Sequence, residues 1–128
     1  MKKAQLFIFL ISTILSCKSP VKEPVVEANE TIQILDKTDF KTGIAKQDIQ
    51  LLDVRTPKEY EEGHIGDAIL IDFLADDFKD KVQSLDKNKP VYLYCRSGGR
   101  SGKASKLLEE LGFIEIYDLK GGYMAWDK

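Results

Sequence analysis

Short strand-like segments alternate with helix-like segments along most of this 128-residue chain, and this alternation restricts the fold more than any other feature. The strand candidates are runs rich in β-branched or aromatic residues. They are Thr31–Ile34, Gln50–Val54, Ala68–Ile71, Val91–Cys95 and Ile114–Asp118. Strands that alternate with helices are typical of a parallel sheet covered by helices. We therefore expect an α/β domain.

Three segments between these strands carry helix signals. Thr56-Pro57-Lys58-Glu59 combines an N-cap, a proline in the first turn and the glutamate of a capping box. The apolar residues of the other two segments fall on one helix face each. They are Leu74, Phe78, Val82 and Leu85 in the first, and Ala104, Leu107, Leu108 and Leu111 in the second. We expect Gly112 to end the second, longer helix as its C-cap.

The first sixteen residues have the three regions of a signal peptide. Lys2 and Lys3 supply positive charge, and the apolar segment Leu6–Leu15 is shorter than the ~20 residues that a membrane-spanning helix needs. Leu15-Ser16-Cys17 resembles the lipobox of bacterial lipoproteins, in which the cysteine is lipidated; a plain secretory signal is the alternative. We expect an exported lipoprotein, anchored through Cys17 to a membrane of the cell envelope on the periplasmic side.

The expected organisation is a signal peptide over residues 1–16, the lipidated cysteine and an extended linker over 17–30, and one domain over 31–128. Pro20 and Pro24, without any aromatic neighbour, favour the extended linker. The chain has 19 basic and 21 acidic residues, a formal net charge of -2, which does not favour nucleic acid as a partner. We expect a monomeric domain.

One loop holds the chemistry that the sequence predicts. The buried-strand pattern Val91–Tyr94 leads to Cys95, and Arg96-Ser97-Gly98-Gly99-Arg100 follows before the longer helix. Ligands of open α/β sheets bind at this carboxyl end of the strands. Adjacent glycines allow several N–H groups to point inward, and the helix start adds its positive end. We expect these groups to lower the pKa of Cys95, so that its thiol is substantially ionised at neutral pH.

The charges near this cysteine indicate an anionic substrate. Arg96, Arg100, Lys103 and Lys106 occur within Cys95–Lys106, which contains no acidic residue. The alternative for Cys95 is a buried structural cysteine, and the alternative for the arginines is a solvated helix start. The strand, the glycine pair, the arginines and the helix together favour a reactive thiolate.

The small number of cysteines excludes other kinds of site. Cys17 and Cys95 are the only two, so neither a disulfide framework nor an all-cysteine zinc site can be assembled. We expect no metal and no cofactor.

Motifs spread from Leu52 to Trp126 point to one family. They are Cys95-Arg96-Ser97-Gly98-Gly99-Arg100, Leu52-Asp53-Val54-Arg55 with Glu59-Tyr60 and Gly63-His64-Ile65, and Gly121-Gly122-Tyr123-Met124-Ala125-Trp126. Together they resemble the single-domain rhodaneses, the thiosulfate sulfurtransferase family, over roughly residues 31–128. The resemblance implies a three-layer α/β/α fold with a central parallel five-stranded sheet, and a Cys95 that carries transferable sulfur as a persulfide.

Three details refine the resemblance. Four residues separate Cys95 from Arg100, whereas cysteine-dependent phosphatases use a loop one residue longer, so phosphatase activity is disfavoured. Gly66-Asp67-Ala68 stands where the family often has Pro-Gly-Ala, a change that shifts a turn, since aspartate tolerates unusual backbone angles. The sequence ends two residues after Trp126, which leaves the last helix short and its docking open.

The expected reaction is a two-step sulfur transfer. The Cys95 thiolate attacks the outer sulfur of a small anionic donor, which is thiosulfate, a polysulfide or a low-molecular-weight persulfide, and a thiol or cyanide-like acceptor then takes that sulfur. Arg96 and Arg100 are expected to hold the donor, while N–H groups of Ser97, Gly98, Gly99, Arg100 and Ser101 stabilise charge on the sulfur. The reaction requires a sulfur that the donor can reach.

Three further residues are expected to support the site. We expect Asp53 and Arg55 to form a structural ion pair and His64, the only histidine, to stabilise a turn by a hydrogen bond. Tyr123 and Trp126 are expected to pack in the core or at the rim of the site. The alternative function is a non-catalytic or redox-sensing rhodanese-like binding module built around the same loop.

Overall fold

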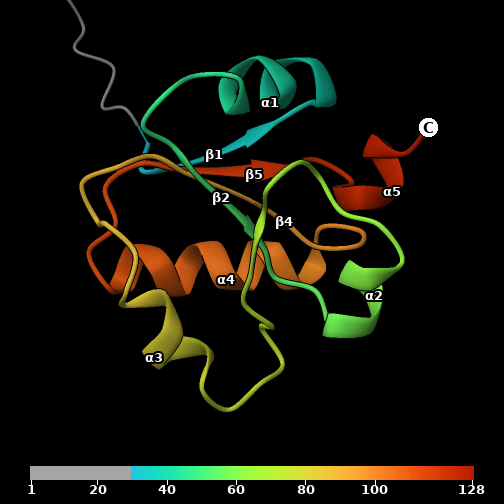
Figure 1. Cartoon of the computed structure of the whole chain (residues 1–128). Coiled ribbons are helices and arrows are strands. Elements are labelled where there is room, and N and C mark those ends of the chain that lie inside the picture. Colours follow the sequence, from blue (N-terminus) through green and yellow to red (C-terminus); the bar gives the residue numbers. More distant parts are fainter. Residues whose placement is uncertain (1–29) are drawn as a thin grey trace, which may run out of the picture.

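A five-stranded parallel sheet forms the centre of the computed structural model, which describes residues 30–128. The predicted signal peptide, Cys17 and all but the last residue of the predicted linker lie outside the described residues. The strand order is β1-β5-β4-β2-β3 (Figure 1). The strands are β1 (Ile32–Leu35), β2 (Gln50–Asp53), β3 (Ile69–Leu70), β4 (Val91–Tyr94) and β5 (Ile116–Leu119). The predicted parallel five-stranded sheet is thus confirmed.

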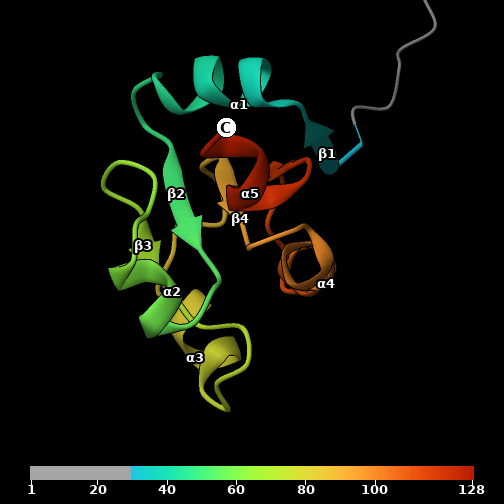
Figure 2. The ribbon, with the colours of Figure 1, turned by 90° about the vertical axis from the view of Figure 1, so that its right-hand side faces the viewer.

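Helices cover both faces of this sheet. They are α1 (Lys37–Ile44), α2 (Pro57–Glu61), α3 (Phe78–Val82), α4 (Gly99–Glu110) and α5 (Gly122–Trp126). α1 and α5 lie on one face, whereas α3 and α4 lie on the other (Figures 1 and 2). The expected three-layer α/β/α arrangement is confirmed. Figure 2 looks onto the carboxyl ends of the strands, where α5 lies in front of β4.

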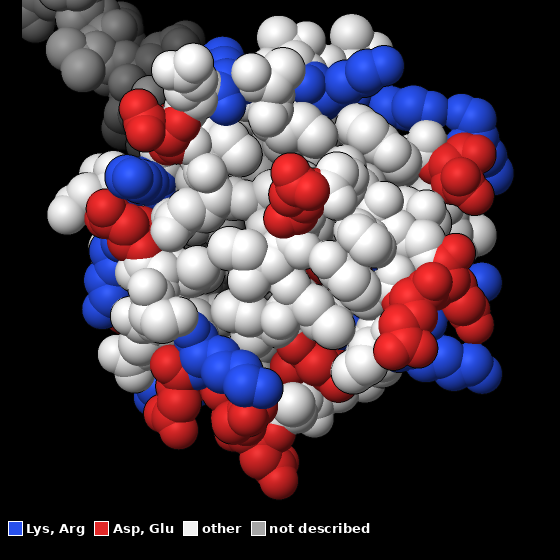
Figure 3. All heavy atoms as spheres, in the orientation of Figure 1, with Lys and Arg blue, Asp and Glu red and all other residues white. Residues whose placement is uncertain are grey.

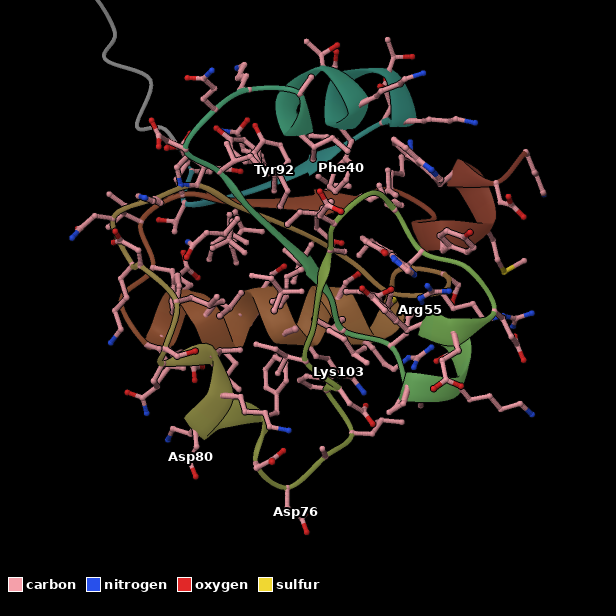
Figure 4. The ribbon with its side chains drawn as sticks, viewed as in Figure 1. Phe40, Arg55, Asp76, Asp80, Tyr92 and Lys103 are labelled. Atoms are coloured by element: carbon pink, nitrogen blue, oxygen red, sulfur yellow. The ribbon has the colours of Figure 1, made fainter. Side chains whose placement is uncertain are left out.

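The central strand β4 contributes to two apolar clusters, one on each face of the sheet, because successive side chains of a strand point to opposite faces. Tyr92 and Tyr94 belong to the cluster beneath α1, in which the rings of Phe40 and Tyr92 meet edge to face with centroids 5.5 Å apart (Figure 4). Leu93 and Cys95 belong to the cluster beneath α4. The alternation therefore directs the side chain of Cys95 toward α4.

The capping box at Thr56 is confirmed, and it starts α2. The Thr56 hydroxyl accepts the N–H of Glu59, and a Glu59 carboxylate oxygen accepts the N–H of Thr56 at 3.0 Å. The helix predicted from Leu74 to Leu85 is shorter than its apolar pattern, because α3 covers only Phe78–Val82. Leu74 lies outside it and is 64% exposed.

Three local expectations differ from the structure in detail. Leu111 is the C-cap of α4, and Gly112 follows it. β5 begins at Ile116, two residues after the predicted start at Ile114. Where Gly66-Asp67-Ala68 replaces the usual family sequence, the positive φ angle lies at Gly66 (47°), and no positive angle occurs at Asp67.

α1 was not predicted from the sequence. Its N-cap is Asp36, whose side chain accepts the N–H of Asp39 at 2.9 Å. From this helix, Phe40 and Ile44 contribute large apolar side chains to the core. Two such residues are too few to display a helical apolar period in the sequence.

The face of the molecule seen in Figure 3 carries few charges at its centre. Acidic and basic side chains are interspersed around its rim. None of the helices in residues 30–128 combines the length and the apolar character that a membrane-spanning helix requires.

Candidate active site

The loop after β4 folds back over the sulfur of Cys95. β4 lies between β5 and β2, and all four of its residues are buried. The Sγ atom of Cys95 accepts the backbone N–H of Gly98 at 3.0 Å. Gly98 has a φ angle of 106°, a conformation that glycine adopts without a steric penalty and that lets its N–H turn back onto the sulfur. α4 begins at the next residue.

The groups around the sulfur favour its thiolate form. Burial by itself raises the pKa of the Cys95 thiol, but hydrogen bonds from the hydroxyl and N–H of Ser101 and from the N–H groups of Gly98 and Ser97 lower it. The net effect is a pKa below the ordinary value of a cysteine thiol. Ser97, Gly98 and Ser101 therefore counter the effect of burial on the thiol.

Cys95 is enclosed, and this differs from the accessible sulfur that the sequence interpretation requires. The residue is 1% exposed, because its side chain faces the apolar cluster beneath α4 and the loop closes over it. Arg96, Ser97 and Gly99 are themselves exposed, so the sulfur lies directly beneath the surface of the loop. Access to the sulfur from solvent is therefore restricted in this structure.

α5 holds the same loop from the opposite side. The N–H of Tyr123 donates to the carbonyl oxygen of Cys95 at 2.8 Å, and the N–H of Met124 donates to that of Arg96 at 3.0 Å. Gly122 makes this approach possible, because a Cβ atom there would lie 2.5 Å from the Cys95 carbonyl oxygen. The short last helix is therefore docked directly on the cysteine loop.

Arg100 is bound by a carboxylate rather than free for a donor. Its two Nη atoms donate to the two carboxylate oxygens of Glu59 at 2.8 Å each. The hydrogen bond from Arg100 lowers the pKa of Glu59 to about 2. Arg96 is exposed and forms no ion pair within residues 30–128. Of the two arginines predicted to hold the donor, Arg96 is thus the one with a free guanidinium.

The expected ion pair between Asp53 and Arg55 is present and buried. Arg55 Nη2 lies 2.7 Å from Asp53 Oδ2 and also donates to the carbonyl oxygen of Gly63 at 2.6 Å. The Arg55 guanidinium packs over the ring of Tyr123, 4.2 Å from its centroid, and also over the ring of Tyr94. The pair therefore joins the end of β2 to α5 on the side of the cysteine loop.

His64 makes the turn contact expected of it. Its Nδ1 lies 3.0 Å from the carbonyl oxygen of Tyr60, and its ring stacks on that of Tyr60 with centroids 3.8 Å apart. The described residues provide no hydrogen bond between His64 and Cys95. These contacts stabilise the segment between α2 and β3.

A hollow of about 390 Å³ opens beside the cysteine loop. Basic, acidic and apolar side chains line it together. They are Arg55, Glu59, Glu62, Arg96, Tyr123, Met124, Asp127 and Lys128. Cys95 is not part of this lining, but Arg96, the next residue in the chain, is.

Three residues near the site were not recognised as site residues from the sequence. Glu59 was predicted as a capping residue and as part of a family motif, and Gly122 only as part of a motif. Asp118 lies on β5 and is 5% exposed, and its Oδ1 has no hydrogen-bond partner within the described chain. Burial raises the pKa of Asp118 to about 6. Its position in a strand pattern carries no signal of this environment.

Comparisons with known proteins agree with this geometry. The family model described as "Rhodanese-like domain" matches residues 36–128. The Bacillus subtilis (strain 168) protein YqhL is 41% identical over 95 residues, which are 74% of this chain and 72% of YqhL. The thiosulfate sulfurtransferase GlpE of Coxiella burnetii is 37% identical over 83 residues, which are 65% of this chain and 76% of GlpE.

A solved structure shows the same fold. A rhodanese-like domain protein from Staphylococcus aureus superposes with a TM-score of 0.65 at 33% identity, over 73% of this chain and 90% of that protein. The family match, the related sequences and the shared fold establish that this chain belongs to the rhodanese-like family, which includes sulfurtransferases.

Proposed function

We propose that this protein is a sulfurtransferase that carries sulfur as a persulfide on Cys95. The donor is a small anion that contains sulfane sulfur, such as thiosulfate, a polysulfide or a low-molecular-weight persulfide. The acceptor is a thiol or a cyanide-like nucleophile. No metal or cofactor takes part in this scheme.

The reaction has two nucleophilic steps. With thiosulfate, the Cys95 thiolate attacks the outer sulfur, a new S–S bond forms, and sulfite leaves with the electron pair of the broken S–S bond. The acceptor then attacks the outer sulfur of the persulfide, and Cys95 leaves as a thiolate. Arg96 attracts the donor anion, and the N–H groups that face the sulfur stabilise the thiolate in both steps.

The observation that carries the proposal is the hydrogen bond of 3.0 Å from the Gly98 N–H to the Cys95 sulfur. A cysteine that is only a small core residue does not need a loop that folds back to donate to it. The hydroxyl and N–H of Ser101 add to this bond, and the pKa of the thiol is lowered despite its burial.

Mass spectrometry of the intact protein tests the proposal. After incubation with thiosulfate, and separately with a polysulfide, the chain is expected to gain the mass of one sulfur atom and to lose it again with a thiol or cyanide. Cys95→Ser is expected to gain nothing, while Cys17→Ser serves as the matched control and keeps the gain. A wild-type chain that gains no sulfur from any donor class contradicts the proposal.

The enclosure of Cys95 favours one alternative, a binding module that uses the loop without turnover. Such a module is expected to bind thiosulfate or another anion near Arg96 with no sulfur gain at Cys95. Isothermal titration beside the mass measurement separates the two functions. Binding without mass gain supports the module, and mass gain supports the enzyme.

We also propose that the mature protein is an exported lipoprotein, anchored through Cys17 on the periplasmic side of a cell-envelope membrane. Support comes from the charged start, the apolar segment Leu6–Leu15 and the lipobox-like Leu15-Ser16-Cys17. Metabolic labelling with a fatty acid is expected to label the wild type and not Cys17→Ser. A label retained by that variant contradicts the proposal.

A further inference from the structure

Arg100, in the first turn of α4, is held by a carboxylate from a distant part of the chain. Its two Nη atoms donate to the two carboxylate oxygens of Glu59 at 2.8 Å each, and both side chains are only 23% exposed. A guanidinium binds an oxyanion such as sulfate or phosphate through the same forked contact, with two parallel N–H···O bonds. Glu59 therefore occupies the groups with which Arg100 would bind the oxygen atoms of a donor.

The Glu59 carboxylate is fixed from its other side as well. Its Oε2 atom accepts the N–H of Thr56 at 3.0 Å and the hydroxyl of Thr56 at 3.1 Å, so the capping box of α2 holds it in place. A free anion has to displace this carboxylate to reach Arg100. An intramolecular partner acts at a high effective concentration, so the fold favours Glu59 over a free anion.

The hollow beside the cysteine loop has no excess of positive charge. Its lining has three basic and three acidic side chains. The basic ones are Arg55, Arg96 and Lys128, and the acidic ones are Glu59, Glu62 and Asp127. Arg55 is moreover paired with Asp53. An oxyanion with two negative charges therefore gains no net electrostatic attraction from this lining.

We infer that Glu59 is a positioning residue that sets the donor specificity of the site by keeping Arg100 from binding oxyanions. The inference rests on the proposed function and narrows it, because it makes a low-molecular-weight persulfide a better donor than thiosulfate. The oxygen atoms of thiosulfate require hydrogen-bond donors such as the Nη groups of Arg100. A persulfide group has no oxygen atoms, and its sulfur atoms are weak acceptors.

Sulfur loading from a persulfide requires nothing from Arg100. The Cys95 thiolate attacks the outer sulfur of R–S–SH, a new S–S bond forms, and R–S⁻ leaves with the electron pair of the broken S–S bond. The proton stays on the transferred sulfur, so one thiolate is consumed and one is released. With thiosulfate, the leaving sulfite carries two negative charges, and the guanidinium that Glu59 holds is not available to stabilise them.

The test compares two donors, thiosulfate and the persulfide of 2-mercaptoethanol, by the second-order rate constant of sulfur gain at Cys95, followed by intact mass. Glu59→Gln keeps an oxygen for the Thr56 N–H but loses the charge and one of the two acceptors of Arg100. We expect the ratio of the thiosulfate rate to the persulfide rate to rise about tenfold, the effect of one charge-assisted hydrogen bond. A merely structural role of Glu59 would change both rates equally.

Two further variants separate the Glu59–Arg100 pair from general effects of charge. Glu61→Gln is the matched control, because it removes an exposed carboxylate from the same helix at a position that does not line the hollow. We expect it to keep the donor ratio of the wild type. Glu59→Gln combined with Arg100→Ala lacks the freed guanidinium, and we expect it to lose the gain. Glu59→Asp, with its shorter side chain, gives the same comparison where Glu59→Gln does not fold.

Sulfate binding tests the inference without any sulfur transfer. Sulfate is an oxyanion like thiosulfate but has no sulfane sulfur, and isothermal titration should show about tenfold tighter binding to Glu59→Gln than to the wild type. Glu61→Gln should bind sulfate as weakly as the wild type does. If neither donor loads Cys95, the proposed function fails, and the sulfate titration still decides the inference.

Three results overturn the inference. The first is a donor ratio or a sulfate affinity that is the same in the wild type and Glu59→Gln. The second is an equal rise in Glu61→Gln, which would make the effect one of general charge. The third is a gain that persists when Arg100→Ala is added to Glu59→Gln.

Discussion

Gly122→Ala tests whether α5 holds the cysteine loop in place. Gly122 has a φ angle of 63°, and a Cβ atom added there would lie 2.5 Å from the carbonyl oxygen of Cys95 and 2.6 Å from that of Arg96. Ordinary van der Waals contact begins at 3.4 Å. The alanine methyl group must therefore push α5 away from the two carbonyl groups that its own N–H groups bind.

The magnitude follows from two contributions. A left-handed backbone conformation costs an alanine about 1–2 kcal/mol. Separation of α5 from the loop weakens the hydrogen bonds from Tyr123 to Cys95 and from Met124 to Arg96, each worth about 0.5–1.5 kcal/mol. Together they predict that Gly122→Ala lowers the free energy of unfolding by about 2–5 kcal/mol.

Gly66→Ala is the matched control for the backbone contribution. Gly66 also has a positive φ angle, 47°, but a Cβ atom there would meet nothing within 4 Å. Urea denaturation of both variants should show a loss of about 1–2 kcal/mol for Gly66→Ala and a clearly larger one for Gly122→Ala. The gain of sulfur at Cys95, measured by mass, should fall only in Gly122→Ala. Equal losses of stability in the two variants would refute the reasoning.

Three more substitutions give distinct results in urea denaturation. Because burial raises the pKa of Asp118 from 3.8 to about 6, the native chain binds a proton there that the unfolded chain has lost, and stability falls as pH rises through that window. Asp118→Asn should thus be more stable than the wild type by up to about 3 kcal/mol above about pH 7, and this gain should vanish below about pH 4; a difference that does not change with pH refutes this. The pKa of Glu59 is lowered to about 2, so its carboxylate stabilises the native state above about pH 4.5 and loses that effect as pH falls toward 2. Glu59→Gln should therefore lower the free energy of unfolding by about 1–2 kcal/mol at neutral pH and by less in acid. Arg55→Lys keeps the charge but loses the forked contact with Asp53 and the carbonyl of Gly63, and a loss of about 2 kcal/mol is expected; an unchanged midpoint contradicts it.

The features that the sequence predicted correctly depend on residues close together in the chain. Strand β4 and the start of α4 follow from one continuous stretch around Cys95, and the capping box of Thr56 and Glu59 spans four residues. In each case the signal is an apolar pattern or a side-chain contact between residues a few positions apart. Such signals are present before the chain folds.

The features that were not predicted depend on contacts between distant segments. Glu59 binds Arg100 across 41 positions of sequence, and α5 meets the Cys95 carbonyl only because β5 lies next to β4. The environment of Asp118 depends on the same strand order, which places it opposite the first turn of α4. The enclosure of Cys95 likewise results from packing of the whole loop. Composition and spacing contain no direct information on these contacts.

Because all five strands are parallel, their amino ends lie at one edge of the sheet and their carboxyl ends at the opposite edge. The chain enters β1 at Ile32, on the amino-terminal edge of the sheet, whereas Cys95 follows β4 on the carboxyl-terminal edge (Figure 1). The edge at which the described chain begins is thus opposite the edge that carries the sulfur-bearing loop, so that donors and acceptors meet the loop at the far end of the sheet.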